Sequence, residues 1–296
     1  MAALDIFSPL FGVRGEAWYN HSGRSDIAVG LKAMHVWLAL GWHDIRQRYR
    51  RSVIGPFWFT LSTLIMVGVL GILYSTLLGQ EIHNYLPYLG VGLVVWQYIS
   101  TVVNEGANTF IGSAYLIKQI RMPLTIHVAR IVWRNFVVLM HSLPVVFLFL
   151  LAFGHRPGWE LLLVVPGLFL LLLHGVWIGI VLGILCARYR DVYPIVGNLI
   201  QVAFFFTPVM WQANLLKDRE WLAELNPLYH LIEIVRAPMI DSHLELTSWL
   251  WSIGSSSAAW PRWSTGSMKS CWRPISPPTF QRAISTGSKT LVFSIW

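Results

Sequence analysis

Few residues in the apolar parts of this sequence have the chemistry of a catalytic or proton-carrying group. His141 and His174 stand alone in long charge-free runs, where a histidine more often bonds a neighbouring helix than a ligand. Glu105 and Asp191 lie at the ends of such runs, and Glu233 follows the last of them. A proton-coupled carrier would bury carboxylates within its spans, so the sequence indicates no energy source of its own for transport.

Motifs for nucleotides and metals are missing from the sequence as well. The segment Gly287-Ser288-Lys289-Thr290 resembles part of a phosphate-binding loop, but its glycine is not adjacent to the lysine and no upstream glycine has the required spacing. The two cysteines, Cys186 and Cys271, give no disulfide framework, and no Cys/His cluster has the spacing of a zinc site. We expect no catalytic residue, no metal and no cofactor in this chain.

The elements that would position a functional residue are strongly apolar. Hydrophobic residues make up 55% of the 296 residues and charged residues 12%, and the mean hydropathy is +0.55. Soluble domains carry about 25% charged residues, so this composition argues against a cytosolic enzyme and against a disordered protein. The net charge of +8 suits either a nucleic-acid-binding protein or a membrane protein with basic cytoplasmic loops.

Five charge-free runs decide the fold class. They predict membrane spans near residues 56–78, 86–104, 135–153, 161–186 and 193–213, each close to or above the ~20 apolar residues that cross a bilayer. The runs lack the strict alternation of a β-barrel, so helices are the expected solution. The first run lies too deep in the chain to be a cleaved signal peptide. We predict an all-α, polytopic integral membrane helical bundle with five clear spans.

The basic residues concentrate on one side of these spans. The chain up to residue 51 and the segments 105–134 and 188–191 carry 13 Lys and Arg against 6 acids. The segments on the other side carry 4 Lys and Arg against 8 acids. The positive-inside rule places the first side, and with it the N-terminus, in the cytoplasm.

Residues 31–51 have the pattern of an amphipathic helix in the membrane interface. One face carries Leu31, Met34, Leu38, Trp42, Ile45 and Tyr49, and the other mostly carries Arg46, Arg48, Arg50 and Arg51. Two interpretations stay open: a basic anchor and nothing more, or a fixed platform that transmits motion to the first span.

Two loop segments have helical character without the length of a span. Residues 112–123 form a short cytoplasmic segment that mixes apolar and basic residues and ends at Pro123. It either packs on the spans of this chain or docks a partner subunit. Residues 226–237 begin with Asn226 as a cap and Pro227 in the first turn, and they suit a re-entrant or interfacial segment.

Several of these segments, taken in order, resemble the permeases of polysaccharide ABC exporters, of the type-2 ABC transporter family. The resemblance covers about residues 30–253 and is most like the O-antigen and capsule branch. It is carried by residues 44–52 followed by Gly55-Pro56-Phe57-Trp58, then 85–89, 116–119 with Arg121 and Pro123, 186–191, 205–208, and 226–230 with Glu233 and Arg236-Ala237-Pro238.

The resemblance implies a homodimeric half-transporter in the bacterial inner membrane, driven by a separate ABC ATPase subunit that binds ATP and Mg. Its substrate would be an undecaprenyl-diphosphate-linked polysaccharide. Residues 113–121 would be the coupling helix, with Tyr115, Leu116, Ile117, Lys118, Gln119 and Arg121 as contacts. The segment 226–237 would cap the channel from outside, and the channel or gate candidates are Phe57, Trp58, Tyr74, Phe205, Trp211, Tyr229 and Glu233.

The C-terminal part departs from that family. Residues 247–253 begin a sixth span, but the composition changes at Gly254, and residues 255–296 contain no acid and no apolar run of span length. We therefore divide the chain into a cytoplasmic segment (1–30), a transmembrane domain (31–254) and an aberrant low-complexity tail (255–296), in which the sixth span is lost. Our hypothesis for this tail is a shifted reading frame near Gly254, and a genuine periplasmic tail is the alternative.

Two other function classes compete with export. A membrane-embedded transferase acting on polyprenyl-phosphate-linked sugars would need carboxylates and usually a metal at the membrane interface. The outer segments carry no Asp-rich motif near a span end. A non-catalytic membrane scaffold is the third interpretation.

Overall fold

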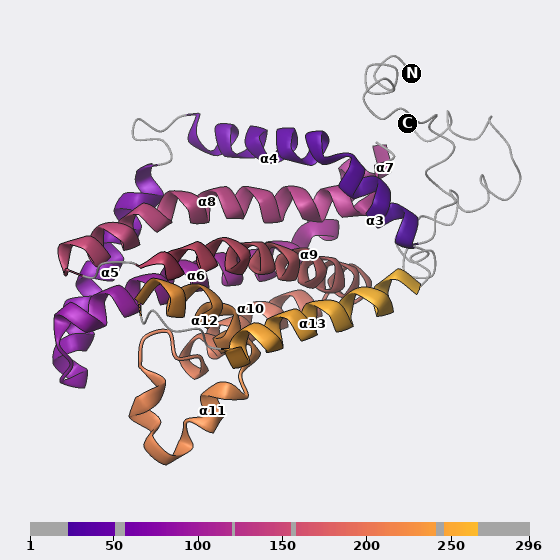
Figure 1. The fold of residues 1–296 in the computed structure, drawn as a ribbon. Coiled ribbons are helices and arrows are strands. Elements are labelled where there is room, and N and C mark those ends of the chain that lie inside the picture. The colour runs from indigo at the N-terminus through magenta and orange to yellow at the C-terminus, as the bar shows by residue number, and fades with distance from the viewer. Residues whose placement is uncertain (1–22, 51–56, 120–121, 155–157, 241–245, 266–296) are drawn as a thin grey trace, which may run out of the picture.

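The structure is a computed structural model that describes residues 23–50, 57–119, 122–154, 158–240 and 246–265, and these residues contain helices and no β-strand (Figure 1). The helices are α3 (Gly23–Lys32), α4 (Met34–Tyr49), α5 (Phe57–Leu78), α6 (Ile82–Gly112), α7 (Ala114–Gln119), α8 (Leu124–Ala152), η2 (Trp159–Leu163), α9 (Val164–Arg188), α10 (Val192–Phe206), η3 (Ala213–Arg219), α11 (Trp221–Glu224), α12 (Pro227–Ile240) and α13 (Leu246–Thr265). The predicted all-α fold class is confirmed.

Four helices of the described chain are long and apolar enough to cross a membrane. They are α5 with 22 residues, α6 with 31, α8 with 29, and the continuous stretch Trp159–Arg188 with 30. These helices coincide with the first four predicted spans. Three of them are longer than predicted: α6 runs on to Gly112, α8 already begins at Leu124, and the fourth stretch runs from Trp159 to Arg188.

The fifth predicted span is shorter than expected. Helix α10 has 15 residues and ends at Phe206, so it covers about 22 Å. A bilayer core is about 30 Å thick. Thr207 has left the helical conformation (φ −88°, ψ 134°) because a residue that precedes proline, here Pro208, is pushed towards extended geometry. The predicted extension of this span to residue 213 is therefore wrong.

Helix α6 is the centre of the bundle and packs against α5, α8, α9, α10 and α12. Its contact with α9 is close because two glycines face each other there. A Cβ on Gly106 would lie 2.9 Å from the Cα of Gly179. Small residues at such a crossing allow the two backbones to approach, as is common between membrane helices.

Helix α12 lies inside the bundle, where it packs against α6, α9, α13 and η2. Its residues 229–239 are all buried. The Asn226 side chain accepts a hydrogen bond from the Leu228 backbone N–H at 2.9 Å, which confirms the predicted cap. On α9, a Cβ on Gly167 would lie 2.7 Å from the Ile234 carbonyl oxygen, so only glycine allows this approach of α9 to α12.

Helix α13 continues through Gly254, where the change of segment was predicted. It packs against α12, α9 and α3, and it buries Ser248, Ser252 and Ser256 on one face. The Ser255 hydroxyl lies 3.0 Å from His174 Nε2, so this histidine does bond a neighbouring helix. Helix α13 is not among the helices apolar enough to span a membrane, and residues 266–296 of the predicted tail lie outside the described residues.

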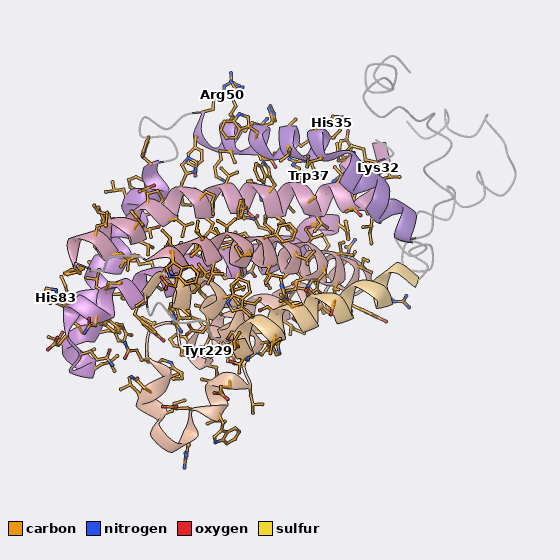
Figure 2. All side chains as sticks on the ribbon, in the orientation of Figure 1. Lys32, His35, Trp37, Arg50, His83 and Tyr229 are labelled. Carbon is orange, nitrogen blue, oxygen red and sulfur yellow. The ribbon has the colours of Figure 1, made fainter. Side chains whose placement is uncertain are left out.

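The bundle has two distinct ends. Lys32 of α3 lies at one end and His83, at the start of α6, lies at the other (Figure 2). Helix α7 and the first turn of α8 lie at the same end as α3 (Figure 1). All three belong to segments whose charge predicts a cytoplasmic position.

Candidate functional site

Two clusters of charged and polar side chains stand out in the apolar bundle. The first, here called the three-helix cluster, joins α4, α6 and α8 and consists of Asp44, Arg48, Glu105, Arg130, Arg134 and Asn135. The second, here called the α12 cluster, consists of Tyr88, Tyr229, Glu233 and Arg236.

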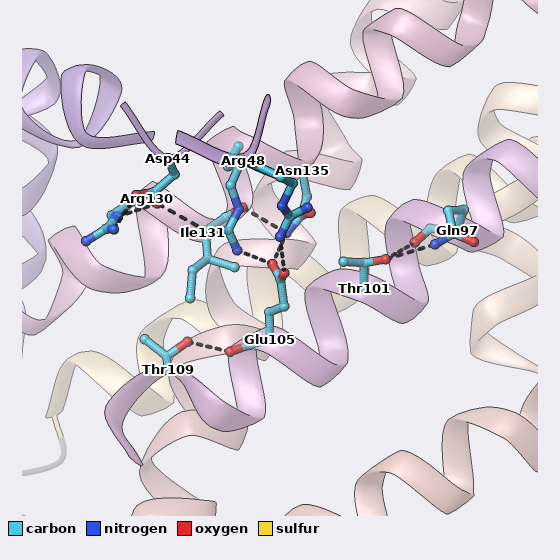
Figure 3. Close-up of polar contacts among 10 residues, drawn as sticks. Asp44, Arg48, Gln97, Thr101, Glu105, Thr109, Arg130, Ile131 and Asn135 are labelled. Atoms are coloured by element: carbon cyan, nitrogen blue, oxygen red, sulfur yellow. Dashed lines mark hydrogen bonds and ion pairs between the residues drawn. The ribbon is translucent and has the colours of Figure 1, made fainter. Parts of the chain in front are cut away.

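In the three-helix cluster, Asp44 of α4 holds two arginines of α8 (Figure 3). Arg130 Nε donates to Asp44 Oδ2 at 2.5 Å, and the same guanidinium also donates through Nη2 to Oδ1. Arg134 Nη1 lies 3.2 Å from Asp44 Oδ2. The bidentate contact from Arg130 fixes the orientation of both groups.

Arg134 connects this pair to the central helix. Its Nη2 donates to Glu105 of α6. Glu105 also accepts a hydrogen bond from Asn135 Nδ2 (Figure 3). Arg48 of α4 completes the cluster, with its Nη2 3.5 Å from Glu105 Oε1. The side chains range from 9% exposed at Asp44 through 26% at Glu105 to 43% at Arg48, so the cluster extends from a buried core to the surface.

The face that α4 turns to α8 differs from the predicted apolar face. It is centred on Trp37, Gly41 and Asp44, and a Cβ on Gly41 would lie 2.8 Å from the Trp133 ring. Among the stripe residues whose side chains the structure describes, only Ile45 is buried, whereas Met34 and Trp42 are about half exposed. Helix α4 runs alongside the span-length helix α8 (Figure 1), whereas a helix in the plane of the membrane interface, as predicted, would cross it.

The predicted basic face of α4 is divided. Arg46 and Arg50 are exposed, and Arg50 points away from α8 (Figure 2), but Arg48 turns inward to Glu105. Burial raises the pKa of the Tyr49 phenol, against the opposing effect of the Arg48 charge, so this ring stays neutral. Arg51, the last predicted residue of this helix, lies outside the described residues. The single helix expected over 31–51 is also interrupted at Ala33, between α3 and α4.

A carboxylate from α3 caps the start of α8. Asp26 accepts hydrogen bonds from the backbone N–H of Leu124 at 3.2 Å and from that of Thr125 at 3.1 Å. It also accepts one from the Thr125 hydroxyl at 2.7 Å. A negative charge at a helix N-terminus is favourable and satisfies N–H groups that have no partner within the helix. The chain that leaves α7 is thereby fixed to α3.

Helix α7 lies between the end of α6 and the capped start of α8 in the chain, and it contains most of the predicted coupling residues. Tyr115 is 74% exposed, Leu116 is half-buried, and Ile117 packs against the apolar core. Lys118 and Gln119 belong to the helix, but their side chains lie outside the described residues, as does all of Arg121. The short helix thus presents Tyr115 at the surface and attaches through Ile117.

In the α12 cluster the central group is Arg236, which is 1% exposed. Its Nε donates to Glu233 Oε1 at 3.1 Å, and its Nη2 donates to the same oxygen. Its Nη1 donates to the Pro208 carbonyl oxygen at 2.8 Å. The guanidinium carbon lies 3.9 Å from the centre of the Tyr88 ring and 6.0 Å from that of Tyr229, which adds cation–π attraction.

Two tyrosines of α6 hold the irregular segment that follows α10. The Tyr88 hydroxyl lies 3.1 Å from the carbonyl oxygens of both Pro208 and Trp211, and Tyr85 donates to the carbonyl of Met210. A Cβ on Gly92 would lie 3.1 Å from the Val209 carbonyl oxygen. The α12 cluster therefore fastens residues 207–211 directly onto the central helix.

The predicted channel and gate residues do not form one site in the single chain. Glu233 and Tyr229 are buried in the α12 cluster, and Trp211 lies beside it and donates to the Phe205 carbonyl at 3.2 Å. Tyr74 is half-buried against the core. Three aromatic rings are instead exposed on α5 and α10, namely Phe57 (69%), Trp58 (56%) and Phe205 (70%).

Most residues of the three-helix cluster are not among the functional residues predicted from the sequence. Asp44 and Glu105 are acids within strongly basic segments, which is a signal of ion pairing that could have identified them. Arg130 and Arg134 were counted only as charges that set the topology. Among the described residues, no three His, Cys, Asp or Glu side chains gather closely enough to hold a metal ion.

Comparison with known proteins places the chain among membrane transport proteins. The family model described as ABC-2 type transporter matches residues 35–240. The O-antigen export system permease protein RfbA of Myxococcus xanthus is 27% identical over 210 residues, which cover 70% of this chain and 81% of that protein. Two proteins of the same description from Klebsiella pneumoniae are 25% and 23% identical, each over 64% of this chain and 74% of its relative.

Proposed function

This chain belongs to the ABC-2 type transporter family, and we propose that it is the membrane-spanning subunit of an ATP-driven exporter of lipid-linked polysaccharide. The substrate is an O-antigen or capsule type of polymer on undecaprenyl diphosphate, and it moves across the bacterial inner membrane. Two copies of the chain, each with a cytoplasmic N-terminus, form the channel, and a separate ABC ATPase subunit binds ATP and Mg.

The observation that carries the proposal is the match of residues 35–240 to the family, together with relatives described as O-antigen export permeases over most of their length. The four apolar helices of span length agree with a multi-pass membrane subunit. A membrane subunit that performs no chemistry of its own needs an energy source, and members of an ABC transporter family draw it from an ATPase.

The three-helix cluster supports a route for motion from the ATPase into the spans. In this proposal the ATPase pushes on α7 through Tyr115 and its neighbours. Helix α7 is attached to α6 on one side, and on the other side the start of α8 is held by Asp26 of α3. Because Arg134 joins Asp44 of α4 to Glu105 of α6, a displacement of α8 is transmitted to both helices.

The α12 cluster supports a second role, that of a fixed outer closure. Arg236 binds both Glu233 of its own helix and the carbonyl of Pro208, so α12 and the segment after α10 are joined. In this proposal the joined elements form the outer boundary of the channel. In this proposal α12 and the segment after α10 are both attached to α6. The outer boundary of the channel therefore opens only if α6 moves relative to α10.

The transferase interpretation has less support. Of the 8 acids on the predicted outer side, Glu233 lies within an apolar helix, and it is buried and paired with Arg236. A carboxylate held in this way is not available to bind a metal or to accept a proton from a substrate.

Deletion of the gene, followed by analysis of surface and membrane-bound polysaccharide, tests the proposal. Export predicts loss of surface polymer while lipid-linked polymer accumulates in the cytoplasmic leaflet. Loss of polymer synthesis itself would support the transferase instead. Co-purification of an ABC ATPase with the tagged chain, and its release when Tyr115 is replaced by Ala together with Lys118 and Arg121, tests the partner and the coupling helix.

A further inference from the structure

A stripe of uncharged polar side chains runs along the central helix. Gln97, Thr101, Asn104 and Asn108 of α6 are spaced by four, three and four residues, which places them on one face of a helix. All four are exposed or half-exposed in the single chain. They lie between Glu81 and Glu105 or just beyond, so most of the stripe falls in an apolar, charge-free part of the chain.

The stripe begins where α5 leaves the surface of α6. Nearer the start of α6, the same face is covered by α5: a Cβ on Gly71 would lie 3.0 Å from Leu86, and one on Gly90 would lie 3.5 Å from Val67. From Gln97 onward this face is open. This face of α6 is therefore apolar where α5 covers it, and it carries amides and a hydroxyl where it is exposed.

Helix α10, which packs beside the stripe, has two different exposed flanks. One flank carries Ile195, Leu199, Val202 and Phe206, which are all exposed and apolar. The other flank is formed by the residues that directly precede these in the sequence, so it lies about 100° around the helix. It carries Pro194, Asn198, Gln201 and Phe205. Within the described chain, Asn198 and Gln201 make no side-chain hydrogen bond.

The polar flank of α10 is the one next to the stripe. Gly197 faces Asn104 of α6, since a Cβ on Gly197 would lie 3.5 Å from Asn104 Oδ1. Phe204 packs against Trp96, with ring centres 5.4 Å apart. On the surface of α10, Gln201 and Phe205 lie next to the residues that contact α6, and the apolar flank lies farther from α6. The two helices therefore combine their polar residues into one surface.

Gln97 donates to the Thr101 hydroxyl and Asn104 donates to the Ser100 carbonyl, and each amide has further donor and acceptor sites beyond that bond. Amide groups left unpaired on an apolar helix surface do not face lipid, because leaving them without a hydrogen bond in hydrocarbon costs about 2–7 kcal/mol. We propose that this surface (Gln97, Thr101, Asn104, Asn108, Asn198 and Gln201) is the hydrated wall along which the sugar chain of the polymer passes. The assignment rests on the proposed export function and adds the residues that contact the substrate.

The chemistry of these side chains suits a glycan. Amide and hydroxyl groups both donate and accept hydrogen bonds, as sugar hydroxyls do. None of them carries a charge, so a long polymer is not held at one point while it moves. Phe205, on the same flank, offers a ring face on which a sugar can stack.

Labelling of single cysteines tests the surface. In a chain in which Cys186 and Cys271 are replaced by Ala, Gln97→Cys, Asn198→Cys and Gln201→Cys are each compared with the matched control Leu199→Cys on the apolar flank of the same helix. A charged, membrane-impermeant thiol reagent is applied to the membrane-inserted exporter with its ATPase. We expect the three test positions to react at least about tenfold faster than Leu199→Cys, because only a hydrated thiolate reacts with such a reagent.

The result that overturns the proposal is equal, slow labelling at all four positions, which would place the surface against lipid. Rapid disulfide crosslinking between two copies at Gln97→Cys without labelling would make it a dry contact of two chains and would overturn it as well. If Gln97→Cys fails to insert, the α10 positions carry the same comparison on one helix.

The sugar chain as occupant is tested by repeating the labelling in cells with and without polymer synthesis. We expect labelling at Gln201→Cys to be several-fold slower when lipid-linked polymer is present, with no change at Leu199→Cys. Labelling that is fast but indifferent to polymer would show a wet surface that no glycan touches. The gene-deletion phenotype is measured separately, so failure of the surface and failure of the export function give different results.

Discussion

The two charged clusters of this chain use the same kinds of residue in opposite ways. The α12 cluster pairs two residues three positions apart on one helix, with Arg236 only 1% exposed, and it binds a backbone carbonyl. The three-helix cluster pairs residues from helices far apart in the chain, with exposures from 9% to 43%. The first joins groups within one region of the fold, and the second connects three separate helices.

The difference lies in what can replace a lost partner. Around Arg236 the neighbours are the Tyr88 and Tyr229 rings and the Pro208 carbonyl, and Arg236 is 1% exposed, so a charge left alone there has little water to solvate it. Around Glu105 there are three donors, and water reaches the cluster at Arg48. Partners in the three-helix cluster can therefore be exchanged during motion at little cost. Those in the α12 cluster cannot.

The largest expected effect is that of Arg236→Met, which leaves Glu233 charged and buried. Breaking a buried pair in this way costs about 3–5 kcal/mol, so we expect little folded protein in the membrane and a strongly lowered midpoint of thermal unfolding in detergent. Removing both charges, as in Arg236→Met with Glu233→Met, is the control and should recover much of the loss. If Arg236→Met alone is as stable as the parent chain, the proposed difference between the two clusters is wrong.

The next effect is that of Arg134→Met, which removes the link through α8 between Asp44 of α4 and Glu105 of α6 and leaves only the weaker Arg48–Glu105 contact. Hydrogen bonds to charged groups contribute about 1.5–3 kcal/mol, so the variant should insert but lose a measurable part of its stability. Export of polymer should slow while the ATPase still co-purifies. The control Arg134→Lys keeps the charge but cannot contact Asp44 and Glu105 at the same time as the guanidinium does. If this variant exports polymer at the parent's rate, only the charge of Arg134 matters.

Tyr88→Phe sharpens the comparison within the α12 cluster. The ring stays over Arg236, whereas the hydroxyl contacts to the Pro208 and Trp211 carbonyls are lost. Net hydrogen bonds contribute about 1 kcal/mol, so we expect a small drop in the unfolding midpoint. Proteolysis near residues 207–211 should become faster. Unchanged cleavage there would mean that Arg236 alone holds the segment.

The smallest effect is that of Arg48→Ala at the exposed edge of the three-helix cluster. Exposed ion pairs contribute about 0–1 kcal/mol and are weakened by salt. We expect a loss of stability that is measurable at low ionic strength and disappears at high ionic strength. Arg46→Ala, an exposed neighbour that makes no contact with Glu105, is the matched control. A salt-independent loss would show that Arg48 acts through packing.

The spans were predictable because a run without charges is a direct requirement of the bilayer. The ends of the spans were not predictable, because a search for charge-free runs stops at the first charged residue. Glu105 and Arg134 end the predicted spans, yet α6 and α8 continue past them, since these residues neutralise each other across the helices. The pairing depends on helices that are far apart in the chain, and no local pattern reports it.

The α12 cluster was half predictable. The capping of α12 by Asn226 and the interest in Glu233 follow from residues close together in the chain. The carbonyl of Pro208 is a partner of Arg236 only because the chain breaks at Thr207 and turns back onto α6. For α4, the helical repeat identified an apolar stripe, but the Gly41 contact with Trp133 selected a different face for packing. A glycine that admits a bulky ring is invisible to a hydrophobic pattern.

The Asp26 cap of α8 also sets an order of assembly. Asp26 and Leu124 are 98 residues apart, and at about 5–20 residues per second the second emerges roughly 5–20 s after the first. During this interval α5 and α6 leave the ribosome, while α3 still lacks its place on α8. Helix α3 therefore reaches its place on α8 only after α5 and α6 have been synthesised, although it precedes both in the chain.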